Sequence, residues 1–498
     1  ALPKSKFFAI HKRKAMLSTL LSTIKSVLPP WPEWALDVLL LMSGLLIITL
    51  IMTSFYTPDD EKESTKIESS KSNETVSTSK SHQVLHREFD AFRRQYMIVY
   101  AIIMLADWMQ GTHMYTLYLS YGVNISALFL TGFLSGALFA PFLGSAVDTF
   151  GRQKACVVYC LLEIVINILE HTTHFPTLLL GRVLGGISTN LLFSAFESWM
   201  TTEHRKRGFP DEWLTRTYSE ASMVNGSTAV LAGIVAQVME DMFGQIGPFQ
   251  GAIGLTVLAL ILVLRWEENY GEDESKSSND TAHSNVYTQF LDGWKTTISD
   301  SRVWRIGMTQ ALSEGAMYTF VFMWVPTLLS QNPPGGVPTG CVFSSLMIAI
   351  TMGGVVFTPL HAFITYLTSK SIGSEVTASL IYFVASISMA IPATCLSGFL
   401  DGDCFRNIIG AFLVMEFCVG LFMPVAGTLR SKYVPDSLQG AILNIFRLPL
   451  NAIVVAGTHA TDVLDHSVVF SLVSTCLFLA ALLQASMIIG NERKSKKD

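Results

Sequence analysis

The chain has 498 residues, of which 50% are hydrophobic and only 15% are charged, with a net charge of −5. A soluble protein carries about a quarter charged residues, so this composition excludes an ordinary soluble globular domain. The charges stand between apolar runs of roughly 20 residues, the length that crosses the hydrocarbon core of a bilayer as a helix. Because backbone groups in lipid must be bonded within their own segment, the sequence predicts an all-α polytopic membrane protein.

The first 94 residues are predicted to hold one membrane segment and one linker. Residues 1–34 are basic and irregular, and residues 35–52 form an apolar run that predicts an extra N-terminal hydrophobic helix. Residues 53–94 are rich in Ser, Lys, Glu and Thr, with few apolar side chains to bury. This composition is typical of a disordered polar linker.

Twelve further apolar runs follow, in two sets of six separated by a polar, charged segment. The predicted units are a first six-helix half at 95–266, a central loop at 267–305, a second six-helix half at 306–489 and a basic tail at 490–498. Lys and Arg are concentrated in the loops on one side, the side of Arg152, which is therefore predicted to be cytoplasmic. The first helix of each half carries an acid, Asp107 and Glu314, which favours duplicated halves with a site between them.

The segment from Gly144 to Lys154 resembles the signature of the major facilitator superfamily between helices 2 and 3. The residues at the motif's spacing are Gly144, Asp148, Gly151, Arg152 and Lys154. Longer strings resemble the molybdate-anion transporter family within that superfamily: Ala106–Gly111, Gly181–Trp199, Phe209–Trp213, Glu268–Tyr270 and Asn444–Pro449. The resemblance implies the major facilitator fold of two six-helix halves, preceded by an extra hydrophobic segment, and uptake of molybdate.

Arg447 is the foremost candidate for binding a substrate anion. It lies inside an apolar run, where an ionisable side chain is costly and marks a functional site. Asn444 and Asn451 are three and four residues away and share its helix face. A tetrahedral oxyanion needs a cation and several hydrogen-bond donors, which an arginine with flanking amides supplies. The alternative is that Arg447 pairs with an acid such as Glu416 for packing only.

Four other residues are assigned to the predicted substrate site: Arg182, Asn190, Gln110 and Gln310. Arg182 follows Gly181 in the fourth helix of the first half, and the superfamily resemblance implies a role in coupling for it. Direct contact with the anion and a purely structural ion pair are the alternatives.

Three carboxylic acids, Asp107, Glu314 and Glu416, are predicted to couple transport to an ion. A carboxyl group in low-dielectric surroundings can cycle between protonated and ionised forms, and an anion that enters a negatively charged cell needs a driving ion. The alternative is that each carboxylate neutralises an arginine. The loop residues Gly144, Asp148, Gly151, Arg152 and Lys154 are predicted to gate the cytoplasmic face, and the superfamily resemblance implies that Glu197 reaches Arg152.

The sequence contains no nucleophile–base constellation, nucleotide-binding loop or metal cluster. It therefore predicts neither an enzyme nor a cofactor, a metal or a nucleic-acid partner. The function expected is secondary active import of molybdate by alternating access, ion-coupled, in a monomer of the plasma membrane surrounded by lipid. The alternatives are a major facilitator transporter of sulfate or a small organic solute, and a non-transporting membrane sensor or receptor.

Overall fold

The computed structural model describes residues 29–54, 76–270, 291–369, 372–399, 402–435 and 439–495, and within these ranges the chain is helical without strands. Residues 1–28, 55–75, 271–290 and 496–498, with the short gaps at 370–371, 400–401 and 436–438, lie outside the described residues. The expectations for most of the N-terminal segment, for part of the linker and central loop, and for the end of the tail therefore stay predictions.

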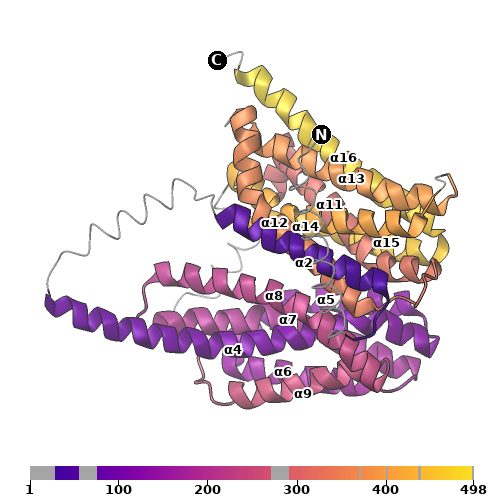
Figure 1. Ribbon diagram of the computed structural model, residues 1–498. Coiled ribbons are helices and arrows are strands. Elements are labelled where there is room, and N and C mark those ends of the chain that lie inside the picture. The colour runs from indigo at the N-terminus through magenta and orange to yellow at the C-terminus, as the bar shows by residue number, and fades with distance from the viewer. Residues whose placement is uncertain are drawn as a thin grey trace, which may run out of the picture.

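The main elements of the described fold are two bundles of six helices and one additional helix, and residues 291–299 are also helical (Figure 1). The first half consists of α4 (Val76–Tyr121), α5 (Ile125–Phe150), α6 (Arg152–Leu169), α7 (Phe175–Lys206), α8 (Asp211–Phe243) and α9 (Gly247–Val263). The second half consists of α11 (Ser301–Ser330), α12 (Thr339–Leu367), α13 (Gly373–Leu396), α14 (Cys404–Tyr433), α15 (Gln439–Val463) and α16 (His466–Ser495). The additional helix is α2 (Glu33–Ser54). These elements confirm the predicted all-α fold of two halves with an extra N-terminal helix.

Within the described residues, seven helices are long and apolar enough by composition to cross a membrane, and α2 is one of them. The helices outside that set include α4, α11 and α15, which carry Asp107, Glu314 and Arg447. The charges that lower their hydropathy therefore include those singled out as functional candidates. Such charges are tolerated at membrane depth where they face protein or an aqueous path.

Helix α4 begins at Val76, so residues 76–94, expected to be a linker, are helical. Phe89 and Phe92 explain the difference, because both are only 1% exposed. Their rings lie 5.5 and 5.8 Å from that of Phe209. The expected linker as a whole is polar, so its average hydropathy did not indicate these two aromatic residues. Their spacing of three places them on one helix face.

The loop expected from Gly144 to Lys154, between the second and third helices, is a turn of one residue. Helix α5 runs to Phe150 and α6 begins at Arg152, while Gly151 between them has φ of 110°. Only glycine adopts such a value without strain. The side chain of Asp148 and the surroundings of Gly144 lie outside what the structure describes, so their predicted gating roles stay predictions.

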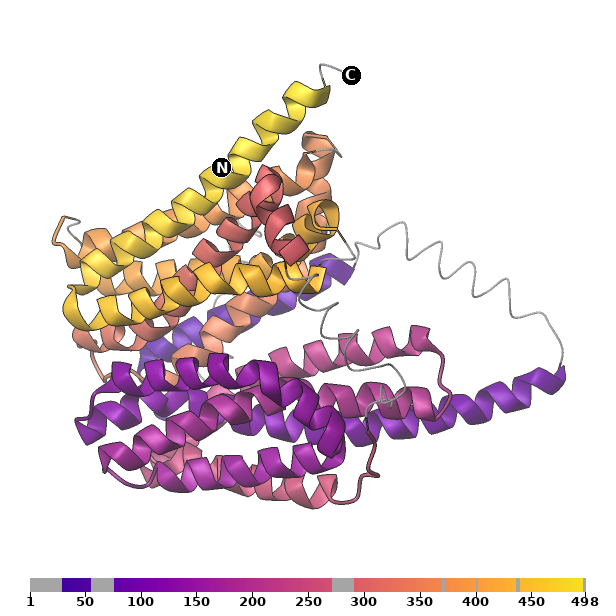
Figure 2. The same ribbon diagram turned by 180° about the vertical axis from the view of Figure 1, so that it is seen from behind.

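The two ends of the bundle differ in charge and in contact between the halves. We call the end that holds Gly151 and Lys432 the basic end, and the end that holds Gly244 and Pro334 the opposite end. The hydrogen bonds that join described residues of the two halves gather toward the opposite end: Ser126 with Asp462, Gly340 N with Gln237 Oε1 at 2.9 Å, and Ser344 Oγ with Val230 O at 2.7 Å. Toward the basic end the ribbons of the halves diverge (Figures 1 and 2).

Helix α2 begins at the opposite end and lies along the seam between the halves. Its residues Ala35, Leu36, Leu39 and Met42, with Trp31 just before it, are buried against α12, and α8 and α14 lie at the margins of the same cluster. The extra helix is thus an integral part of the bundle. Its outward face, which includes Leu41 and Ile47, is exposed and apolar, as a lipid-facing surface requires.

Candidate functional site

One face of α11 carries Gln310, Glu314 and Tyr318 at intervals of four residues, which places the three side chains in a row. The ring of Tyr318 meets that of Phe133 from α5 edge-on, with centroids 5.6 Å apart. This row therefore lies on the surface of the second half that faces the first half.

Arg430 of α14 reaches the same row. Its Nη1 donates a hydrogen bond to Gln310 Oε1 at 2.9 Å, and Gln310 Nε2 donates to Glu314 Oε1 at 2.8 Å. The neutral amide of Gln310 thus stands between a guanidinium and a carboxylate. All three side chains are half-buried.

Arg447 approaches the row from α15. The α15 helix packs closely on α11, because a Cβ on Gly307 would clash with the Phe446 ring and one on Gly315 would clash with Ile453. This register puts Arg447, the residue after Phe446, at the depth of Gln310. The charges of Arg447 and Arg430 both act on Glu314.

The Arg447 side chain is exposed, and among the described residues it forms no hydrogen bond or ion pair. Asn451 is exposed one turn further along the helix. The side chain of Asn444 lies outside what the structure describes. The structure therefore brings together Gln310, Glu314 and Arg447, with Asn451 nearby on the same helix.

Glu416 is the acid that the sequence offers as a packing partner for Arg447. It is 4% exposed within α14, and no hydrogen bond or ion pair to its carboxyl is found in the described part of the chain. A pair of Glu416 with Arg447 is therefore absent from these residues. The coupling role of Glu416 stays a prediction.

The acids of the first half form a separate group. Glu163 of α6 is 6% exposed and accepts hydrogen bonds from Gln110 Nε2 at 2.8 Å and from Ser188 Oγ at 2.5 Å. Asp107 is half-buried one turn before Gln110 on α4. Gln110 is thus bound to a carboxylate of its own half, and Glu163 joins Asp107 as an acid at membrane depth.

The charge of Arg182 is neutralised by an ion pair within the first half. Its Nη2 lies 2.9 Å from Glu170 Oε1, and Tyr118 Oη donates to the same carboxylate oxygen at 2.8 Å. Its guanidinium also lies over the Tyr118 ring, 5.9 Å from the centroid. Among coupling, anion contact and a structural ion pair, this geometry favours the structural ion pair for Arg182.

Asn190 contributes to helix packing. Its Nδ2 donates to Gly136 O at 2.8 Å and to Gly186 O at 2.9 Å, across the close contact of α5 with α7. A Cβ on Gly186 would come within 2.5 Å of Gly136 N. The amide of Asn190 is therefore engaged within the first half, as are Gln110 and Arg182.

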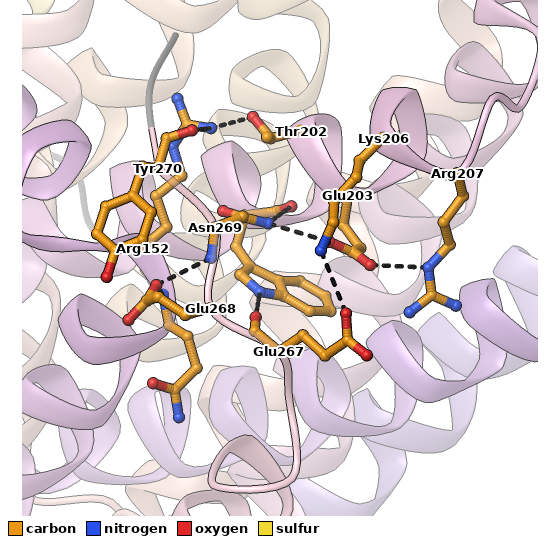
Figure 3. A network of polar contacts seen from close by, with 11 residues as sticks. Arg152, Thr202, Glu203, Lys206, Arg207, Glu267, Glu268, Asn269 and Tyr270 are labelled. Atoms are coloured by element: carbon orange, nitrogen blue, oxygen red, sulfur yellow. Dashed lines mark hydrogen bonds and ion pairs between the residues drawn. The ribbon is translucent and has the colours of Figure 1, made fainter. Parts of the chain in front are cut away.

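The segment that leaves α9 forms a polar network at the basic end (Figure 3). The Glu268 carboxylate accepts hydrogen bonds from the backbone of Gln153 at 2.8 Å and of Lys154 at 3.2 Å, and so caps the N-terminus of α6. Asn269 is 4% exposed and donates to Trp199 O at 3.2 Å and to Glu203 Oε2 at 3.5 Å. This segment thus fastens the ends of α6 and α7 together.

Arg152 belongs to this network. Its backbone N–H donates to Asn269 O at 3.0 Å, and its guanidinium donates to Thr202 and to Tyr270 O at 3.3 Å (Figure 3). Glu197, expected to reach Arg152, is exposed and close to Tyr218. It lies more than a turn before Thr202 on α7, so the gating pair of Glu197 with Arg152 stays a prediction.

Sequence reasoning missed Arg430, Glu163, Glu170 and Glu268 as members of these clusters. Arg430 lies in the last turn of its helix, so the charge pattern groups it with the loop cations of the basic end. The available signal was its distance from that end, since it lies three residues inside Tyr433, where α14 stops. The sequence indicates the role of Glu268 less clearly, because only folding brings it to Gln153 and Lys154, more than 100 residues earlier.

Known proteins resemble this chain in sequence. A family model described as sugar transporters with 12 transmembrane helices matches residues 70–421. The chain is 31% identical over 420 residues to the molybdate-anion transporter of Xenopus tropicalis, covering 82% of this chain and 88% of the relative. It is 31% identical over 412 residues to that of Danio rerio, covering 77% and 82%.

Solved transporters share the fold at low sequence identity. The nucleoside transporter NupG matches with a TM-score of 0.59 and 10% identity, over 80% of this chain and 99% of that one. The peptide transporter PepTSo matches with a TM-score of 0.61 and 12% identity, over 81% and 98%. At these identities the likeness concerns the arrangement of helices alone.

Proposed function

Because the chain belongs to the molybdate-anion transporter family of the major facilitator superfamily, we propose that it imports molybdate into the cytosol as an ion-coupled secondary transporter. Its relatives bear the name of a transporter of this anion and not of an enzyme. The substrate, the direction and the coupling are parts of this proposal.

The observation that carries the proposal is the exposed guanidinium of Arg447 beside the row on α11. A cation without an ion-pair partner is costly at membrane depth, and a bound oxyanion would balance its positive charge. Arginine offers a planar fork of donors that matches the oxygens of such an anion. Gln310 and Asn451 supply further amide donors at the same face.

The divergence of the halves toward the basic end supports alternating access. In this conformation the halves meet near the opposite end, through Gln237 and Ser344, and the Arg447 site lies nearer the basic end. Rocking of one half against the other would expose the site to the two sides in turn. The positive-inside bias would make the basic end the cytoplasmic one.

Glu314 is the carboxylate best placed to couple a proton to the anion. It shares the electrostatic field of Arg430 and Arg447. A dianion brought next to an ionised Glu314 would leave this cluster with one excess negative charge, whereas protonation of Glu314 would leave it neutral. A proton taken up with the anion therefore improves the charge balance of the loaded site.

The test is molybdate uptake in cells that lack their own carrier, measured at several pH values with sulfate and an organic anion as competitors. We expect saturable uptake that increases as external pH falls and that tungstate inhibits. Glu314→Gln should remove most of the pH dependence. Uptake no greater than in untransfected cells, with the protein present in the membrane, would overturn the proposed function. If sulfate competes more strongly than unlabelled molybdate, sulfate and not molybdate is the substrate.

A further inference from the structure

The arginines within the described bundle differ in their partners. Arg182 pairs with Glu170 at 2.9 Å, and Arg207 at the end of α7 is 2.9 Å from Glu203. Arg430 forms no ion pair with any carboxylate of the described chain, and its hydrogen bond goes to the neutral oxygen of Gln310. In the described part of the chain, Arg430 therefore has no directly bonded carboxylate, and its hydrogen bond goes to a neutral dipole.

Gln310 stands between the charge of Arg430 and the carboxylate of Glu314. Its carbonyl oxygen is turned toward Arg430 because its amide nitrogen donates to Glu314 at 2.8 Å. A guanidinium has five N–H donors, and the bond to Gln310 uses one of them. The remaining donors are compatible with an incoming ligand.

Arg430 and Arg447 come from different helices, α14 and α15, and both act on Glu314 of α11. We propose that Arg430 is the second anion-binding arginine of the site and that it sets the preference for doubly charged over singly charged tetrahedral oxyanions. This inference rests on the proposed function, since it assumes that the Arg447 site receives the substrate.

The physical argument is one of charge and exchange. A tetrahedral dianion has four oxygens and two negative charges, which two guanidinium groups match once Glu314 is protonated, whereas a monoanion is balanced by one. On binding, an anion oxygen takes the place of the Gln310 carbonyl on Arg430. The anion oxygen carries a charge that the Gln310 carbonyl lacks, so its attraction to the guanidinium is stronger, and the exchange favours the anion.

The experiment compares molybdate with perrhenate, a tetrahedral oxyanion of the same shape with one charge less. Uptake of molybdate by the full-length protein is measured against concentration, with perrhenate as competitor. Arg430→Gln should raise the molybdate KM about tenfold or more. The inhibition ratio, defined as the perrhenate inhibition constant divided by the molybdate KM, should fall toward one. Arg430→Lys keeps the charge, so its ratio should stay closer to the wild-type value than that of Arg430→Gln.

Arg265→Gln is the matched control, because Arg265 is exposed just beyond α9 in the first half. It should leave both constants unchanged. Gln310→Glu is the second variant, nearly equal in size, which would supply Arg430 with a carboxylate and should raise the molybdate KM as Arg430→Gln does. It keeps the test valid if Arg430→Gln does not reach the membrane.

The outcomes separate the two proposals. Wild-type uptake that Arg447→Gln abolishes, with an unchanged molybdate KM and an unchanged inhibition ratio in the Arg430→Gln and Gln310→Glu variants, would overturn the role of Arg430 alone. A wild-type protein that neither takes up molybdate nor is inhibited by it would overturn the proposed function and this inference with it.

Discussion

The indole Nε1 of Trp31 donates a 2.7 Å hydrogen bond to Oδ2 of Asp241, 210 residues later in the chain. One turn on, the ring of Trp34 meets that of Phe405 edge-on, with centroids 4.8 Å apart. Asp241 belongs to α8 of the first half and Phe405 to α14 of the second. Helix α2 and the residues just before it therefore bridge the halves at the end where they already touch, which should stabilise this conformation.

Trp31→Phe should lower the thermal stability of the purified protein in detergent. The substitution keeps an aromatic ring but removes a hydrogen bond to a carboxylate, a loss of about 1.5–3 kcal/mol. Trp34→Phe is the matched control, since its Nε1 is buried without a hydrogen-bond partner in the described chain. Equal melting temperatures for the two variants would contradict a bridging role for the Trp31 bond.

Gly151→Ala should destabilise the basic end of the first half. Gly151 has φ of +110°, and a Cβ there would stand 2.6 Å from Glu268 Oε2. The added methyl would thus strain the backbone and displace the carboxylate that caps α6, whose loss costs about 1 kcal/mol or more. The melting temperature and the monodisperse fraction on size exclusion measure the effect.

Gly122→Ala is the control for backbone strain alone. Gly122 also has positive φ, +66°, but nothing lies within 4 Å of the position that an added methyl would take. Its substitution should cost about 1 kcal/mol, clearly less than that of Gly151. If the two variants melt alike, contact with Glu268 contributes nothing to the requirement for glycine at Gly151.

Local information in the sequence predicted the helices better than their pairing. Apolar runs predicted the two halves and α2, because each helix must bury or present to lipid its own apolar surface. Pairing depends on residues that are distant in the chain. Arg182 was identified as a candidate site residue, but its partner Glu170 was not, and the partner decides between a structural and a substrate role.

The candidate site illustrates the same limit. Gln310, Glu314 and Arg447 were recognisable from their chemistry and depth. Arg430 was not, because its role depends on α14 packing beside α11, which no spacing along the chain encodes. The turn at Gly151 lies within the Gly144–Lys154 segment that the motif marks but is much shorter than expected, and the carboxylate that contacts it comes from a distant segment.

The pair of Arg182 with Glu170 should behave as a structural unit. Glu170→Gln or Arg182→Met alone would leave a buried charge unpaired, which costs about 3–5 kcal/mol, so each should reduce the amount of folded protein. The double variant Arg182→Met with Glu170→Met removes both charges and should be closer to wild type. Its molybdate KM should be unchanged; an increased KM with normal folding would instead indicate that Arg182 contacts the anion.

Arg447→Lys should reduce molybdate uptake about tenfold or more, since lysine keeps the charge but presents a point donor in place of the planar fork. Folding and membrane level should be preserved, because the Arg447 side chain is exposed and no described residue depends on it for a hydrogen bond. Arg265→Lys at the exposed end of the first half serves as the control. Radiolabelled or mass-spectrometric uptake, normalised to surface protein, gives the comparison. Unchanged uptake by Arg447→Lys would remove this arginine from the substrate site, even if molybdate remains the transported anion.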